Sequence, residues 1–167
     1  MNIFVLSEDP VEAAEMQCNA HVVKMILETA QLLCFQYEPG EAPYVRSRSH
    51  YNHPCSIWAR QSRENYHWLC IHGLALCEEH LYRYGTKIHS SQKIIESCLE
   101  NSHRLQFPQT GLTEFAVAIN EHQECRKLKD FENMSVVEQY RNYYLHDKKE
   151  FAVWKTRSPP SWWEVIA

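Results

Sequence analysis

The segment from about Ala20 to Gln36 constrains the fold most, because its apolar residues fall on nearly every side of a helix. A helix that is apolar all round has to be surrounded by the rest of the chain, so we expect it at the centre of a domain. With 167 residues, the chain is long enough for one compact domain with a sizeable core, and we expect a single domain over 1–167. The apolar residues of the segment are Val22, Val23, Met25, Ile26, Leu27, Leu32, Leu33 and Phe35.

The other apolar runs also recur at helical spacing, and only four glycines and seven prolines interrupt them. The sequence therefore predicts an all-α fold with a buried central helix, irregular connectors and one short extended segment at residues 2–6. Capping residues and turn residues place further helices at Pro10 to about Cys18, Pro54 to Arg60, Ser62 to Tyr84 and Ser90 or Ser91 to Leu99.

Two more helices are expected towards the end of the chain. A short one is predicted over Phe115 to Ile119, and a capping box of Ser135 and Glu138 predicts a last long helix that runs through Trp154. The prolines that follow should break this helix, and Trp162 and Trp163 are then expected to fold back onto the body of the protein.

The charge balance argues against unaided binding to duplex DNA. The chain has 17 basic and 21 acidic residues, a net charge of -4, whereas such proteins carry a basic face. Any nucleic-acid contact must therefore rest on a local patch. The seven cysteines are an odd number, and neither a leader sequence nor an apolar run of about 18 residues is evident. We expect buried thiols, no membrane segment and a reducing cytoplasm.

A polar stripe runs along the expected central helix: His21, Lys24, Glu28 and Gln31 lie at i, i+3, i+7 and i+10, on one face. A buried charge must be paired or must face a ligand or water, so the stripe is interpreted as one wall of a polar pocket. In the alternative interpretation, Lys24 and Glu28 form an ion pair on a partly exposed face, and His21 makes a local hydrogen bond near the helix start.

The segment from Tyr44 to Trp68 is locally basic and rich in aromatic residues. Guanidinium and imidazole groups bind phosphate oxygens, and aromatic rings stack on bases, so this mixture suits a nucleotide or a single-stranded nucleic acid. In the alternative interpretation, the arginines pair with acids and the aromatic residues belong to the core. The candidate ligand-binding residues in this segment are Arg46, Arg48, His50, His53, Trp58, Arg60, Arg63 and His67.

Closely spaced cysteines and histidines raise two further alternatives, a zinc site and a cysteine nucleophile. Cys18 and His21, and His50, His53 and Cys55, are spaced closely enough to assemble zinc ligands, but the spacing matches no paired C-x-x-C arrangement. A Cys55 nucleophile with His53 as its base lacks any feature that fixes the geometry. The sequence contains no P-loop, no G-x-G-x-x-G and no H-E-x-x-H motif. We expect no metal and no cofactor.

The stretches MNIFVLSEDP, HVVKMILETAQLL, NHPCSIWAR, YRYG and FAVWKTRSPPSWW resemble a family of small, uncharacterised phage-encoded proteins over most of the chain. This resemblance implies the cytoplasm of an infected bacterial cell but supplies no reaction. The chain is also similar to the phage pyrimidine-dimer DNA glycosylases, which are small and all-helical with a central helix and a tyrosine-rich tail.

In the glycosylase family an N-terminal threonine amine attacks the sugar, a glutamate assists it, and arginines hold the DNA. The resemblance implies Glu28 as the glutamate, with Lys24 or Arg60 and Arg63 near the phosphates. The chain departs from that family in its acidic charge and in Asn2, which is large enough that Met1 is expected to be retained. The amine of Met1 or of Lys24 would then have to act as the nucleophile.

Two main functions follow as expectations, beside a third possibility, an interaction module that blocks a host protein through its aromatic tail. The first is a phage protein that binds a small anionic, nucleotide-type ligand and sequesters a host immune signal, a role that needs no nucleophile. The second is a DNA glycosylase or lyase that acts on damaged or modified DNA through Glu28 and an amine. A small nucleotide-type ligand is therefore the expected partner, and DNA is the partner of the second function.

Overall fold

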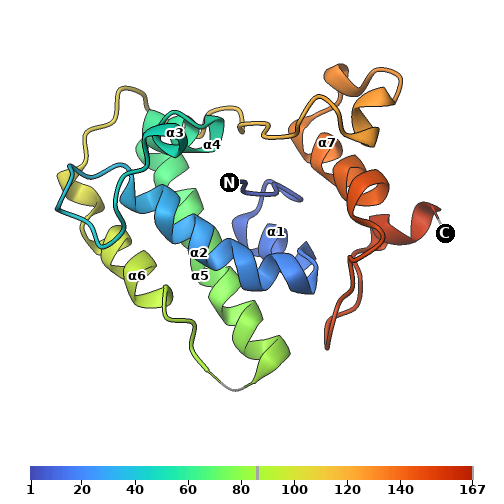
Figure 1. Ribbon diagram of the computed structural model, residues 1–167, viewed down its shortest axis with the longest axis horizontal. Coiled ribbons are helices and arrows are strands. Elements are labelled where there is room, and N and C mark those ends of the chain that lie inside the picture. Colours follow the sequence, from blue (N-terminus) through green and yellow to red (C-terminus); the bar gives the residue numbers. More distant parts are fainter. Residues whose placement is uncertain (86, 167) are drawn as a thin grey trace.

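The computed structural model describes residues 1–85 and 87–166. Two long helices lie at the centre of the protein (Figure 1). They are α2 (Asn19–Cys34) and α5 (Arg63–Tyr84), and they contact each other. Helix α5 also contacts α1 (Pro10–Met16), α4 (Pro54–Gln61) and α6 (Gln92–Glu100). The described residues contain no β-strand, and the predicted all-α fold is confirmed.

Local capping residues set the helix boundaries. The carboxylate of Asp9 accepts hydrogen bonds from the amides of Val11 and Glu12 and so begins α1. Ser62 begins α5 in the same way, and Gly85 ends it in the left-handed region with φ of 69°. The structure confirms these predicted boundaries.

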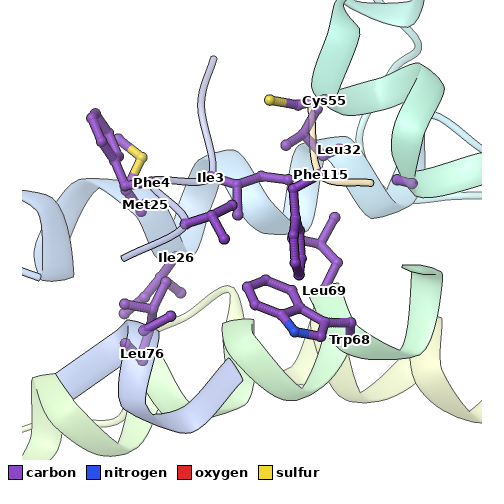
Figure 2. Close-up of a cluster of buried hydrophobic side chains, with 14 of the residues drawn as sticks. Ile3, Phe4, Met25, Ile26, Leu32, Cys55, Trp68, Leu69, Leu76 and Phe115 are labelled. Carbon is purple, nitrogen blue, oxygen red and sulfur yellow. The ribbon is translucent and has the colours of Figure 1, made fainter. Parts of the chain in front are cut away.

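The beginning of the chain fills the space between the helices. The extended segment expected at residues 2–6 is irregular, with a left-handed Phe4 at φ of 57°, but it is fully buried. Figure 2 shows Ile3 and Phe4 of this segment beside Met25 and Ile26 of α2. The N-terminal residues are therefore part of the hydrophobic core.

A buried ion cluster joins three separate segments. Glu79 and Arg83 of α5 are 4% and 2% exposed, and their side chains are 2.8 Å apart. Arg83 donates further hydrogen bonds to the carbonyls of Glu15 and Gln17, in and just after α1. Arg157 of the C-terminal segment adds an ion pair to Glu79 at 2.5 Å. The cluster thus holds α1, α5 and the C-terminal segment together.

The short helix predicted over Phe115 to Ile119 is wrong, because this segment is irregular. Its backbone polar groups pair with distant side chains instead of with each other. The amide of Ala118 donates to the hydroxyl of Tyr140, and the carbonyl of Ala118 accepts from the side chain of Asn2. These partners leave no need for helical hydrogen bonds here.

The last helix has the predicted capping box, but it is shorter than expected. It is α7 (Val136–Tyr143), followed by a π-helical turn at Tyr144–Lys148. The chain then pairs with the start of α2: the Val153 carbonyl accepts from the amide of Asn19 at 2.9 Å. The backbone of residues 152–154, where this contact forms, is not helical. Trp162 and Trp163 pack back onto the core as predicted.

The remaining elements are short. Helix α3 (Arg48–Tyr51) is a single turn inside the connector between α2 and α4. None of the helices in the described part of the chain combines the length and the apolar character that a membrane span requires. Turns of 3-10 helix lie at Ser102–Arg104, Glu124–Lys127, Phe131–Asn133 and Ser161–Ile166.

Candidate functional site

A cavity of about 520 Å³ lies where the end of α2, the connector after it and α3 meet. We name it the tyrosine–arginine pocket. Its volume lies within the range of about 300–1,000 Å³ that is usual for small-molecule sites. It is lined by Cys34, Tyr37, Glu38, Pro39, Gly40, Ala42, Tyr44, Val45, Arg46, Arg48, Tyr51 and Asn52.

Arg46 fixes the shape of the pocket. The chain turns away from α2 at Pro39 and Gly40, and the φ of 88° at Gly40 favours glycine. Arg46 then brings the connector back, because its Nε donates to the Phe35 carbonyl at 3.0 Å and its Nη2 donates to the Tyr37 carbonyl. These two carbonyls lie just past the end of α2, where the backbone lacks helical partners.

Two of the tyrosine walls are anchored by their hydroxyls. Tyr37 donates to the carbonyl of Cys98 at 3.0 Å, and the hydroxyls of Tyr44 and Ser91 are 3.1 Å apart. Burial raises the pKa of Tyr37 to about 12, so this hydroxyl stays protonated at neutral pH. The ring of Tyr37 is therefore held in place against α6, and the ring of Tyr44 against the turn before α6.

The third tyrosine lies between two guanidinium groups. The Cζ atoms of Arg46 and Arg60 are 4.4 Å and 4.2 Å from the centre of the Tyr51 ring. Arg60 also donates a hydrogen bond from its Nη1 to the Tyr51 carbonyl at 2.6 Å. Arg48, by contrast, is exposed and makes no hydrogen bond or ion pair with any described residue. Its guanidinium is the cation of this pocket that is open to a ligand.

The structure does not bring all of the predicted cations into this one pocket. Arg60 lies on the far side of Tyr51, and Arg63 lies over the ring of Phe107 at 5.3 Å. His67 is 3.0 Å from the hydroxyl of Ser102. The predicted segment is thus spread over one end of the molecule rather than gathered around a single hollow.

Trp58 belongs to the core, as the alternative interpretation of the aromatic residues expected. It is 2% exposed and stacks on Phe115 with ring centroids 5.2 Å apart. Its ring is therefore not accessible to a base.

The two histidines before α4 have mainly local contacts. The ring centroids of His50 and His53 are 6.4 Å apart, and His53 accepts a hydrogen bond from the amide of Cys55. The Cys55 thiol is fully buried, and burial raises its pKa to about 12, which leaves it a poor nucleophile. Within residues 1–85 and 87–166, no three His, Cys, Asp or Glu side chains are placed to hold a metal ion.

The polar stripe of α2 does not form one pocket wall. His21 lies inside the core, where its Nδ1 is 2.5 Å from the hydroxyl of Tyr144 and its ring stacks on Phe4 at 4.0 Å. Burial, with a smaller contribution from nearby lysines, lowers the pKa of His21 to about 3, so the ring is neutral. Lys24 is 69% exposed on the outside, and Gln31 is half-buried.

Glu28 has a second partner besides Lys24. Its carboxylate lies 3.5 Å from the Lys24 ammonium and 3.8 Å from the ammonium of Met1, and it accepts a hydrogen bond from the amide of Asn2 at 3.1 Å. We name these four residues the amino-terminal cluster. The pKa of His53 is lowered, first by burial and then by the charge of the Met1 ammonium. Glu28 is only 14% exposed.

These features define an all-helical protein with a ligand-sized pocket and a separate amine–carboxylate pair. No protein-family model, no curated protein and no solved structure matches the chain.

Sequence reasoning missed part of the pocket wall. Cys34 and Tyr37 were not among the candidates, because Cys34 belongs to the expected central helix and Tyr37 follows that helix directly. The available signal was the pair of tyrosines, Tyr37 and Tyr44, on either side of the Pro39–Gly40 turn. Such a turn brings its flanking residues together.

Proposed function

We propose that the protein binds a small anionic, nucleotide-type ligand in the tyrosine–arginine pocket. The observation that carries this proposal is a cavity of about 520 Å³ with two arginines and three tyrosine rings in its wall. Binding without turnover also suits the sequestration of a nucleotide signal, and that role is part of the proposal.

The chemistry of the wall matches the two halves of a nucleotide. Guanidinium groups form paired, charge-assisted hydrogen bonds to phosphate oxygens, and Arg48 has all of its donors available for this. Tyrosine rings stack on bases, and the half-buried ring of Tyr44 is already anchored by its hydroxyl, whereas the buried Tyr37 forms the floor behind it. Walls that are fixed in advance reduce the entropy lost on binding.

Replacing Arg48 with glutamine is expected to weaken ligand binding without unfolding the protein. Loss of a charge-assisted hydrogen bond costs about 1.5–3 kcal/mol, which is roughly a 10- to 150-fold rise in Kd. Calorimetric titration with adenosine monophosphate and ADP-ribose measures this. The matched control is Lys149→Gln, the same loss of charge on an exposed residue after α7. Equal affinities for the two variants, or no binding of either probe to the unmodified protein, would contradict the proposal.

A second candidate function rests on the amino-terminal cluster. An amine held beside a carboxylate is the arrangement that an imine-forming DNA glycosylase needs, and here the Met1 nitrogen lies 3.8 Å from Glu28. The carboxylate can take the proton of the ammonium, and the free amine can then attack C1′ of a deoxyribose. A C1′–N bond to the protein forms, and the bond from C1′ to the base breaks. The base leaves with the electron pair and takes up a proton, and opening of the sugar gives the imine.

Reductive trapping tests this second candidate. Borohydride delivers a hydride to the imine carbon, so DNA with a damaged base should become covalently joined to the protein. We expect Glu28→Gln to abolish the adduct and Lys24→Gln to retain it, because Lys24 points outward. Peptide mapping should place the adduct on Met1, which also requires a free Met1 amine in the mature protein. An adduct that survives Glu28→Gln, or no adduct with a panel of lesions, argues against this function.

A further inference from the structure

Three more cavities lie at the same end of the molecule, and two of them share lining residues with the tyrosine–arginine pocket. One of about 360 Å³ shares Tyr51 with it and is lined on its other side by Arg60 and Phe107. Another cavity, of about 470 Å³, shares Phe107 with the 360 Å³ cavity and is lined by Arg63. A cavity of about 390 Å³ shares Tyr37 with the pocket. Shared lining residues make these four cavities neighbours across this end of the molecule, with Tyr51 between the first and the second. We refer to this row of neighbouring cavities as the depression.

The depression runs across one end of the molecule. Its walls come from the connector that contains α3, from the end of α4 and from the connector after α6, which lie near one another in Figure 1. Most of the arginines that line these cavities belong to the segment from Tyr44 to Trp68. The part that sequence reasoning did not anticipate is the opposite wall, which residues 104–110 provide.

The residues that neighbouring cavities share include two aromatic rings, Tyr51 and Phe107, and each ring lies against arginine side chains. Arg46 and Arg60 lie over Tyr51 at 4.4 Å and 4.2 Å, and Arg63 lies over Phe107 at 5.3 Å. We name these five residues the arginine–aromatic track. Guanidinium planes and aromatic rings at successive positions are the features with which proteins stack the bases of a single strand.

The depression is locally basic in an acidic protein. Five arginines line the four cavities against three glutamates, while the whole chain carries a net charge of -4. Glu41 pairs with Arg104, which is one of these five arginines, at 3.1 Å, and Glu64 accepts from the amide of Gly111 at 2.9 Å. Arg48 and Arg63, towards opposite ends, are exposed and make no hydrogen bond or ion pair with the described residues.

We propose that the arginine–aromatic track extends the nucleotide pocket into a binding site for single-stranded nucleic acid. This inference rests on the proposed nucleotide binding, since one nucleotide of the strand occupies the tyrosine–arginine pocket. The following bases enter the neighbouring cavities, and phosphates lie at Arg48 and Arg63. A duplex is not expected to bind, because its base faces are covered and its regular charge requires a broad basic surface.

Binding as a function of length tests the track. Fluorescence anisotropy would be measured with labelled oligothymidylates of about four, eight and twelve nucleotides, with oligouridylates of equal length and with a duplex. Thymidine monophosphate is titrated by calorimetry for comparison. We expect affinity to rise about tenfold or more from the monophosphate to a strand of about four nucleotides and then to level off. Deoxyribose and ribose strands distinguish a DNA site from an RNA site.

Two variants locate the strand. Arg63→Gln should lower the affinity for the oligonucleotide about tenfold, reduce the slope of log K against log salt by about 0.7 and leave the monophosphate unaffected. Arg48→Gln should weaken both ligands. Lys149→Gln, on another part of the surface, is the control for charge and should change neither.

Each outcome decides between the two proposals. If the monophosphate binds but affinity does not rise with length, the track is rejected and the pocket stands. If strands bind but Arg63→Gln has no more effect than Lys149→Gln, the strand follows another path and the track is rejected. If the duplex binds as tightly as the single strand, the stacking argument fails. If neither the monophosphate nor a strand binds, both proposals fail together.

Discussion

Replacing Glu79 with alanine is expected to lower the free energy of unfolding by about 3–5 kcal/mol, a large part of the roughly 5–15 kcal/mol that stabilises a domain. The reason is the buried guanidinium of Arg83, whose Nε lies 2.8 Å from the Glu79 carboxylate. Without that carboxylate, a charge that is 2% exposed has no counter-ion among the residues that the structure describes. Urea unfolding followed by circular dichroism gives the change.

The control for this prediction lies one residue away. Glu78 is exposed on the same helix, so Glu78→Ala should change stability by less than about 0.5 kcal/mol. A second control is the double variant Glu79→Ala with Arg83→Met, which should cost less than the two single changes added together. If Glu79→Ala is no more destabilising than Glu78→Ala, the buried cluster does not hold α1, α5 and the C-terminal segment together.

Acid is expected to destabilise the protein through two buried histidines. Burial lowers the pKa of His21 to about 3 and that of His72 to about 4, from an ordinary value of 6.5. Above pH 6.5 the rings are neutral in both the folded and the unfolded chain. Below it the unfolded chain takes up protons that the folded protein does not, so stability falls as the pH falls. The loss is about 2 kcal/mol for each histidine at about pH 5, or about 4 kcal/mol together.

The pH dependence also distinguishes the individual histidines. His72→Gln removes one of the two groups, so the slope of unfolding free energy against pH between about pH 6 and pH 5 should fall by about 1.2 kcal/mol per pH unit. His103→Gln, on an exposed histidine, should retain the slope of the unmodified protein. Chemical denaturation at several pH values measures these slopes. A slope that His72→Gln leaves unchanged would show that His72 is protonated in the folded state.

The helices that sequence reasoning located correctly are those with local signals. Asp9, Ser62 and Ser135 each cap a helix within three residues of themselves, and Gly85 ends one. Such contacts depend only on neighbours in the chain, so a pattern can show them. The helix predicted over Phe115 to Ile119 does not form, because the hydrogen-bond partners of this segment, Asn2 and Tyr140, are far away in the sequence.

The candidate site, like the fold, was predictable only in the part that depends on local sequence. The basic and aromatic composition around Arg46 and Arg48 predicted the chemistry of the pocket, because composition is local. The arrangement depends on tertiary contacts that no spacing contains. His21 lies inside because Phe4 and Tyr144 meet it from distant segments, and Glu28 meets the Met1 amine because residues 1–6 run into the core.

The central claim is the proposal that the tyrosine–arginine pocket binds a nucleotide, and a nuclear magnetic resonance titration tests it directly. Adenosine monophosphate would be added to isotope-labelled protein while the backbone amide signals are followed. We predict that the largest shifts occur at residues 37–52, which form the tyrosine–arginine pocket. Largest shifts at Asn2, Ile3 and the amides around Glu28, with residues 37–52 unmoved, would contradict the pocket and favour the amino-terminal cluster as the functional site.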